Sequence, residues 1–229
     1  MDEPYIPNSE SLWNHGSLKT TDGIRSALSK GGDANEREPW RGMTPLHHAA
    51  KYGDEEAIAL LMENGAEINS LCGNDQTPLH SALMSRITIP TVIDTLIGHG
   101  AEVNDGQSMT VAMDYAPQMM ETLINAGADV NRKGPNDETA LHRAALTDNA
   151  YAVQVLMANG ADINARAYDG ARAFDVTRNG SECEALLKSA HQKQDLLEGL
   201  ATQWKPSDCK EEPASNQDEQ LVQVKRRKM

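Results

Sequence analysis

The chain has 229 residues, of which 4% are aromatic, and a formal net charge of −13 at pH 7. This acidity argues against direct nucleic-acid binding, which needs a basic surface. It is compatible with a basic protein partner, although acidity also keeps a protein soluble. No apolar run approaches the roughly 18 residues that a membrane-spanning helix needs, and the acidic start lacks the apolar core of a signal peptide. We therefore expect a soluble protein of the cytoplasm, the nucleus or both, with no membrane association.

The three cysteines, Cys72, Cys183 and Cys209, are odd in number and show no paired spacing. Such cysteines are typical of a reducing compartment and predict neither a disulfide framework nor a zinc site.

The N-terminal segment 1–9 contains two prolines and is expected to form an extended arm. A short helix is predicted from Ser11 to Leu18, and the segment 20–32 supplies a second helix. Polar side chains on this helix pair fit the end of a stack, where one face meets water.

The best-formed stretch runs from Gly42 to Asn69. Thr44 is a helix N-cap and Pro45 occupies the first helical position, where its missing N–H costs nothing. A turn at Gly53 and Asp54 leads to a second amphipathic helix over 55–63. Two short helices cannot bury both of their apolar faces alone, so this unit needs neighbouring copies.

The copies are present along the chain. The opening Thr44–His47 returns at Thr77–His80 and, with alanine for proline, at Thr139–His142. Each unit closes on an asparagine, and the spacings between these are 34, 35, 27 and 33 residues; the closing asparagines are Asn35, Asn69, Asn104, Asn131 and Asn164. A period near 33 with this opening is the signature of ankyrin repeats.

The chain therefore resembles the ankyrin-repeat family over residues 10–190. The resemblance implies an all-α solenoid of about five to six stacked helix-turn-helix units, including degenerate caps, in which each unit contacts only its neighbours. It also implies protein binding through a concave face, with no enzymatic activity and no cofactor.

Two units depart from the pattern. The third has a longer link at 85–90, where Pro90 can start the second helix; this link is either a binding loop or a tolerated insertion. The fourth lacks the Thr-Pro-Leu-His opening and about six residues of its turn or first helix. This shortening predicts a notch in the concave edge, which either fits a partner or reflects decay of one repeat.

A sixth unit, from Asp169 to Leu187, lacks the usual ending and is expected to cap the stack. Leucines in the segment 191–205 predict one more amphipathic helix against that cap. The polar segment 206–229 is expected to be disordered, and it finishes with a basic cluster.

The histidines His47, His80 and His142 occupy the same position in their units, and the resemblance implies that they bond to backbone and hold the units in register. His48 lies beside His47, but adjacent helical residues point about 100° apart and cannot share one metal. The acidic residues two positions before each closing asparagine are interpreted as groups that stabilise the turns. No catalytic, phosphate-binding or metal-binding motif is present, so neither an enzyme nor a small-molecule ligand is expected.

The protein-binding surface is predicted from equivalent positions of the units, counted from the Thr-Pro-Leu-His phrases. These positions lie at the turn tips and on the exposed sides of the first helices. Its anchor is predicted at Trp40, Arg41, Met43 and Tyr52, because such residue types dominate interface energetics. The alternative is that Trp40 folds back onto the first unit. The remaining predicted positions are Lys51, Asn74, Gln76, Met84, Asn136, Glu138, Leu146 and Tyr168.

The basic cluster consists of Lys225, Arg226, Arg227 and Lys228. Such a cluster is typical of a nuclear import signal. It supports an alternative function, that of a nuclear co-regulator that binds a transcription factor.

Overall fold

The computed structural model describes residues 20–86 and 89–203, apart from the side chains of Pro135 and of 200–203. The chain divides into two compact units, Met1–Lys188 and Ser189–Met229. All regular elements in the described residues are helices, and one isolated β-bridge joins Arg166 to Arg172. The predicted all-α class is therefore confirmed.

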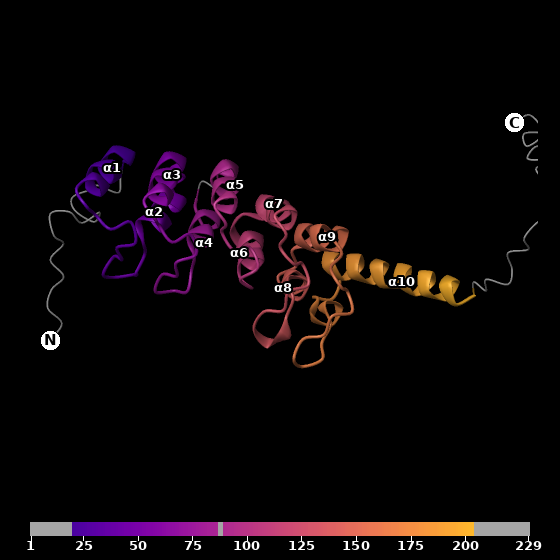
Figure 1. Cartoon of the computed structure of the whole chain (residues 1–229). Coiled ribbons are helices and arrows are strands. Elements are labelled where there is room, and N and C mark those ends of the chain that lie inside the picture. Colours follow the sequence, from indigo (N-terminus) through magenta and orange to yellow (C-terminus); the bar gives the residue numbers. More distant parts are fainter. Residues whose placement is uncertain (1–19, 87–88, 204–229) are drawn as a thin grey trace, which may run out of the picture. The chain divides into compact units, whose positions relative to one another are not determined.

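The helices of the first unit form two rows (Figure 1). The inner row consists of α2 (Pro45–Tyr52), α4 (Pro78–Leu83), α6 (Ser108–Tyr115) and α8 (Ala140–Leu146). The outer row consists of α1 (Thr21–Ser29), α3 (Glu55–Glu63), α5 (Pro90–Gly98), α7 (Met120–Asn125) and α9 (Ala150–Ala158). Short 3-10 helices cover Pro117–Met119, Pro135–Asp137 and Ala173–Val176, and α10 covers Glu182–Gln203. The arm at 1–9 and the helix predicted over 11–18 lie outside the described residues.

Five of the described helices begin at a side chain that caps them in an equivalent way in each row. Thr44, Thr77 and Thr139 each form a capping box with a histidine three residues later, in the position that glutamate usually takes. Asp54 and Asn149 cap the outer helices α3 and α9 by accepting hydrogen bonds from the backbone N–H groups of residues three further on. The threonines of the repeated opening phrases therefore fix the starts of α2, α4 and α8.

One apolar core runs through the repeats. Equivalent leucines of the inner helices, Leu46, Leu79 and Leu141, are fully buried, and they pack with Ile58, Ile93 and the other inward residues of the outer row. Alanines fill most remaining core positions of the inner helices, and their small side chains let adjacent units approach closely. This repeated packing explains how a chain with so few aromatics builds a core.

The closing asparagines connect successive units. Asn131 Nδ2 donates to the carbonyl of Gly160 at 3.0 Å, and its Oδ1 accepts from the backbone N–H of Asp162 at 2.7 Å. Asn35, Asn69 and Asn104 make the same pair of bonds to the next closing turn. Each asparagine side chain thus replaces a backbone partner for a turn of the neighbouring unit, and together they form a ladder along the stack.

The C-terminal part of the repeat region differs from the sequence-based expectation. The sixth unit contains only the 3-10 helix Ala173–Val176 where an inner helix would lie. The helix α10 then continues without a break across residue 190, so the capping helix predicted over 191–205 is the later part of α10 and not a separate element. Leu196 and Leu197 on that part are exposed.

The ladder gives a first prediction. Asn131→Ala removes two hydrogen bonds to the next unit and is expected to lower the free energy of unfolding by about 1–3 kcal/mol. Urea unfolding followed by circular dichroism measures this change. Asn125→Ala, at an exposed position on α7, is the matched control, and an equal effect of both substitutions would contradict a special role for the ladder.

Candidate protein-binding surface

Each closing asparagine is followed by a segment that leads to the next inner helix, and we call these segments fingers. They cover residues 36–43, 70–76, 105–107, 132–138 and 165–171. Figure 1 shows four of them projecting beyond the inner helices, whereas the link between α5 and α6 does not project. The fingers and the inner helices together form the finger side, which is the surface predicted to bind a partner.

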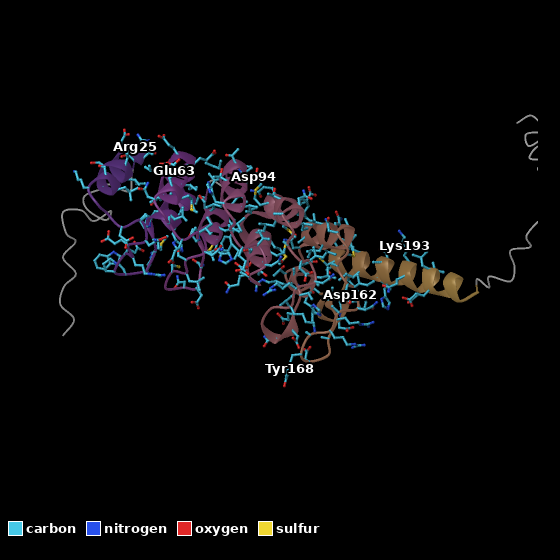
Figure 2. All side chains as sticks on the ribbon, viewed as in Figure 1. Arg25, Glu63, Asp94, Asp162, Tyr168 and Lys193 are labelled. Atoms are coloured by element: carbon cyan, nitrogen blue, oxygen red, sulfur yellow. The ribbon has the colours of Figure 1, made fainter. Side chains whose placement is uncertain are left out.

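Large apolar side chains are exposed on the finger side. The exposed fraction is 85% for Trp40, 70% for Tyr52, 64% for Leu146 and 85% for Tyr168, and Figure 2 places Tyr168 at the tip of the last finger. Because Trp40 is almost fully exposed, it does not pack against the described part of the first unit, residues 20–32. Of the other predicted positions, Arg41, Asn74, Asn136 and Glu138 are exposed, and Lys51, Gln76 and Met84 are half-buried.

Met43 was wrongly predicted to be part of this surface, because only 8% of it is exposed. It directly precedes the N-cap Thr44, a position where apolar side chains commonly fold back over the first turn of the helix. Its carbonyl also accepts a hydrogen bond from the backbone N–H of Glu38 and thereby closes the finger. Met43 therefore stabilises the conformation of the finger and is not exposed to a partner.

The first finger meets its inner helix where a carboxylate approaches a histidine ring. Glu38 of the finger lies with its Oε2 3.4 Å from Nε2 of His48 on α2. The ring of His48 in turn lies 6.1 Å from the ring of Tyr52, centroid to centroid. Burial lowers the pKa of His48, against the opposing influence of Glu38. His48, which the sequence marks only as out of phase, thus connects the finger that carries Trp40 to the helix that carries Tyr52.

Two of the three in-phase histidines, His47 and His142, join an inner helix to the backbone of the next finger, as the resemblance implies. The Nδ1 atoms of His47 and His142 accept from the backbone N–H groups of their N-cap threonines. The proton therefore lies on Nε2, which donates to the carbonyl of Gln76 at 2.9 Å and to that of Ala171 at 3.1 Å.

His80 has a different partner because the next finger is short. Its Nε2 lies 2.9 Å from Oδ2 of Asp105 and 3.2 Å from Oγ of Ser108. Asp105 also caps α6 by accepting from the backbone N–H groups of Gln107 and Ser108, both at 2.8 Å. A carboxylate and a hydroxyl have therefore replaced the finger carbonyl.

These three side chains do not form a catalytic triad. A triad needs the hydroxyl at one ring nitrogen and the carboxylate at the other, whereas Ser108 and Asp105 both meet Nε2, and Nδ1 of His80 accepts from the backbone N–H of Thr77. Ser108 and His80 are also buried. Burial raises the pKa of Asp105, but the hydrogen bonds from His80 and the two backbone N–H groups outweigh it and hold the pKa well below its ordinary value.

A hollow lies where the notch is predicted. The inner helix α6 is full-length, so the missing residues come from the finger 105–107. The third residue of α6 is Thr110, where the other inner helices have histidine. The hollow has a volume of about 430 Å³, and its lining includes Thr110 and Asp114 of α6, Arg132 and Glu138 of the next finger, and Arg143 of α8. The sequence marked this unit as short, but of the residues that line the hollow it named only Asn136 and Glu138 as part of the binding surface.

The acidic excess of the chain lies away from the finger side. The outer helices α3, α5, α7 and α9 and the turns up to their closing asparagines contain no lysine or arginine, and Figure 2 shows Glu63 and Asp94 on that side. The fingers and inner helices carry both signs of charge, including Arg37, Arg41, Arg132 and Arg143. The net charge of −13 therefore does not describe the predicted binding surface.

Two further features bear on possible functions. Among residues 20–86 and 89–203, no group of histidine, cysteine and acidic side chains could hold a metal ion. Cys72 and Cys183 are buried free thiols.

None of the described helices has the length and apolar character required to cross a membrane.

Comparison with known proteins identifies the family. The family model for ankyrin repeats (3 copies) matches residues 16–107 and 107–167, which is more than half of the chain. The chain therefore belongs to the ankyrin-repeat family. Repeats of this family are protein–protein interaction modules and are generally not enzymes.

Similar sequences occur within much longer proteins. The chain is 32% identical to mouse Rabankyrin-5 over 148 residues, which cover 60% of the chain and 12% of that protein. It is 33% identical to human neurogenic locus notch homolog protein 1 over 146 residues, which cover 61% of the chain and 6% of that protein. The match thus spans only a small part of each relative.

Similar solved structures support the fold. One is a chain from the complex of the predatory endopeptidase Bd0816 of Bdellovibrio bacteriovorus with the immunity protein Bd3460, with a TM-score of 0.64 and 21% identity, covering 76% of this chain and 98% of that one. Another is the ankyrin-repeat domain of Bcl-3, a member of the IkappaB protein family, with a TM-score of 0.60 and 16% identity, covering 75% and 95%. At these identities the likeness establishes the fold alone.

The Asp105 contact gives a second prediction. Asp105→Asn is expected to lower the free energy of unfolding by about 1–3 kcal/mol at pH 7, because His80 loses a charged partner. The pKa of Asp105 is lower in the folded chain than its unfolded value of about 3.9. The advantage of the wild type is therefore complete above about pH 5 and declines as the pH falls through 3.9 and below.

Urea unfolding of both chains at several pH values tests this dependence. Asp94→Asn, on the exposed side of α5, serves as the control. A difference between wild type and Asp105→Asn that is the same at pH 7 and at pH 3.5 would contradict the assignment.

Proposed function

We propose that this protein is a non-enzymatic interaction module that binds a partner protein through its finger side. The observation that carries this proposal is the exposure of Trp40 and Tyr52, at 85% and 70%, on an otherwise well-packed unit. Tryptophan and tyrosine are enriched among the residues that contribute most to binding free energy. Membership in a family of interaction modules agrees with this reading.

The contacts around the two aromatics favour a prearranged surface. The Glu38 carboxylate of the finger lies 3.4 Å from the ring of His48 on α2, and that ring lies 6.1 Å from the ring of Tyr52. The hydrogen bond from His47 to the carbonyl of Gln76 holds the next finger to the same helix. A surface that is ordered before binding loses less conformational entropy when a partner docks.

The arrangement of His80, Asp105 and Ser108 favours a structural role over catalysis. All three make hydrogen bonds that replace those of a missing finger. Their role in holding α4 against α6 accounts for each contact without a reaction.

The third prediction concerns the anchor. Trp40→Ala combined with Tyr52→Ala is expected to remove specific partners from affinity purification followed by mass spectrometry. With a purified partner, each substitution is expected to weaken binding about 30-fold, which corresponds to about 2 kcal/mol. Tyr151→Ala, at an exposed position on the outer helix α9, is the control. Identical partner lists for the wild type and the double variant would refute this anchor.

The nuclear alternative depends on Lys225, Arg226, Arg227 and Lys228, which lie outside the described residues. A basic cluster of this kind can be recognised by an import receptor. The fourth prediction is that deletion of residues 225–229 shifts the tagged protein from the nucleus to the cytoplasm in fluorescence images. An unchanged distribution would argue against the signal.

A further inference from the structure

We infer that the hollow of the fourth unit receives an arginine side chain of the partner protein. This inference rests on the proposed function, because it assigns a second contact on the same finger side. The occupant follows from three features of the hollow: a carbonyl that lacks its usual donor, the balance of charge, and a framework that keeps the space open.

The first feature is the carbonyl of Glu138. The equivalent carbonyls of Gln76 and Ala171 each accept two hydrogen bonds, one from a backbone N–H within the finger and one from a histidine Nε2. The carbonyl of Glu138 accepts from the backbone N–H of Gly134 at 2.8 Å, but α6 offers Thr110 in the position of the histidine. A planar N–H donor that enters the hollow can therefore supply the missing bond.

The second feature is charge. The ionised side chains that line the hollow are the acids Asp114, Asp129 and Glu138 and the bases Arg132 and Arg143. Arg143 is already paired, since its Nη2 donates to Oδ2 of Asp114 at 2.8 Å.

Two acceptors remain available to an occupant. Within the part of the chain that the structure describes, Oδ1 of Asp114 and the carboxylate of Glu138 accept no hydrogen bond. Together with the carbonyl of Glu138, these acceptors suit the five N–H donors of a guanidinium.

Arg132 is the feature that opposes a basic occupant. Its Nε lies 3.6 Å from the position that a Cβ on Gly106 would take, so its side chain runs along the short finger at the edge of the hollow. An acidic occupant would gain from Arg132 but would face three carboxylates. Neutralising Arg132 is therefore expected to strengthen the binding of a basic occupant and to weaken the binding of an acidic one.

The third feature is that the hollow is held open by intact contacts. Asn104 makes both bonds of the ladder to the next closing turn, at 2.8 and 2.7 Å. Asp105 and Ser108 replace the missing finger as partners of His80. The unit has lost its finger without losing its connections to either neighbour, and a hollow of about 430 Å³ falls in the range of ligand pockets.

The test uses the full chain labelled with ¹⁵N and titrated with N-acetyl-arginine N-methylamide up to about 20 mM, a range that detects millimolar dissociation constants. The arginine probe is expected to shift the amide signals of Gly106, Thr110 and Gly134 in a saturable manner. N-acetyl-glutamate N-methylamide and N-acetyl-lysine N-methylamide are the comparison probes, and weaker or absent shifts are expected for both.

Three substitutions test the expected direction of the change in affinity for the arginine probe. Glu138→Gln is expected to weaken binding of the arginine probe about tenfold, as expected for loss of a charged hydrogen bond. Arg132→Gln is expected to tighten it about threefold, because a like charge is removed. Glu63→Gln, which removes a charge from the exposed surface of α3, is the control and should leave it unchanged.

Thr110→His provides an independent check. The introduced ring can fill the hollow and donate to the carbonyl of Glu138, as His47 does to that of Gln76. The variant is expected to show no saturable shifts with the arginine probe and an unfolding midpoint at least as high as that of the wild type.

Several outcomes would overturn the inference. They are saturable shifts with the glutamate probe only, tighter binding of the arginine probe by Glu138→Gln together with weaker binding by Arg132→Gln, or no saturable shift with the arginine probe. The double variant Trp40→Ala/Tyr52→Ala should bind the probe like the wild type. Failure at the hollow is therefore distinguishable from failure of the proposed anchor.

Discussion

The structure of the repeat region depends on hydrogen bonds between equivalent positions of successive units. Each closing asparagine satisfies a carbonyl and an N–H of the next closing turn, while histidines of the inner helices bond to the carbonyls of the next finger. These bonds satisfy backbone groups of turns, which a stack of short helices cannot otherwise pair. The apolar core supplies most of the free energy of folding, and the polar bonds fix the register in which it packs.

The fourth unit shows how this register survives the loss of a finger. The ladder through Asn104 is intact, and Asp105 takes the place of the finger carbonyl opposite His80. The histidine position of α6 is occupied by Thr110, so the next finger keeps a carbonyl without its usual donor. These substitutions leave a polar hollow in an otherwise regular surface.

The two sides of the repeat stack differ in composition. The outer helices α3, α5, α7 and α9 lack lysine and arginine and carry only acidic charge, which favours solubility. The finger side combines exposed aromatic residues, notably Trp40 and Tyr168, with both signs of charge. A partner that docks there meets a surface of mixed character, and hydrogen bonds from His47 and His142 to the next fingers hold part of this surface in place before the partner arrives.

The sequence by itself determined the repeat period, the N-caps and the identity of the shortened unit, because these follow from local preferences and recur at fixed spacing. It also placed Trp40 and Tyr52 on the exposed surface by phase. Only the tertiary structure decided that Met43 is buried, that α10 is continuous across residue 190, and that Asp105 is the partner of His80. Such details depend on contacts between residues of different units, or on how a side chain turns at a helix start. A periodic pattern fixes which positions are equivalent, but it does not specify the atoms that meet where one unit departs from the pattern.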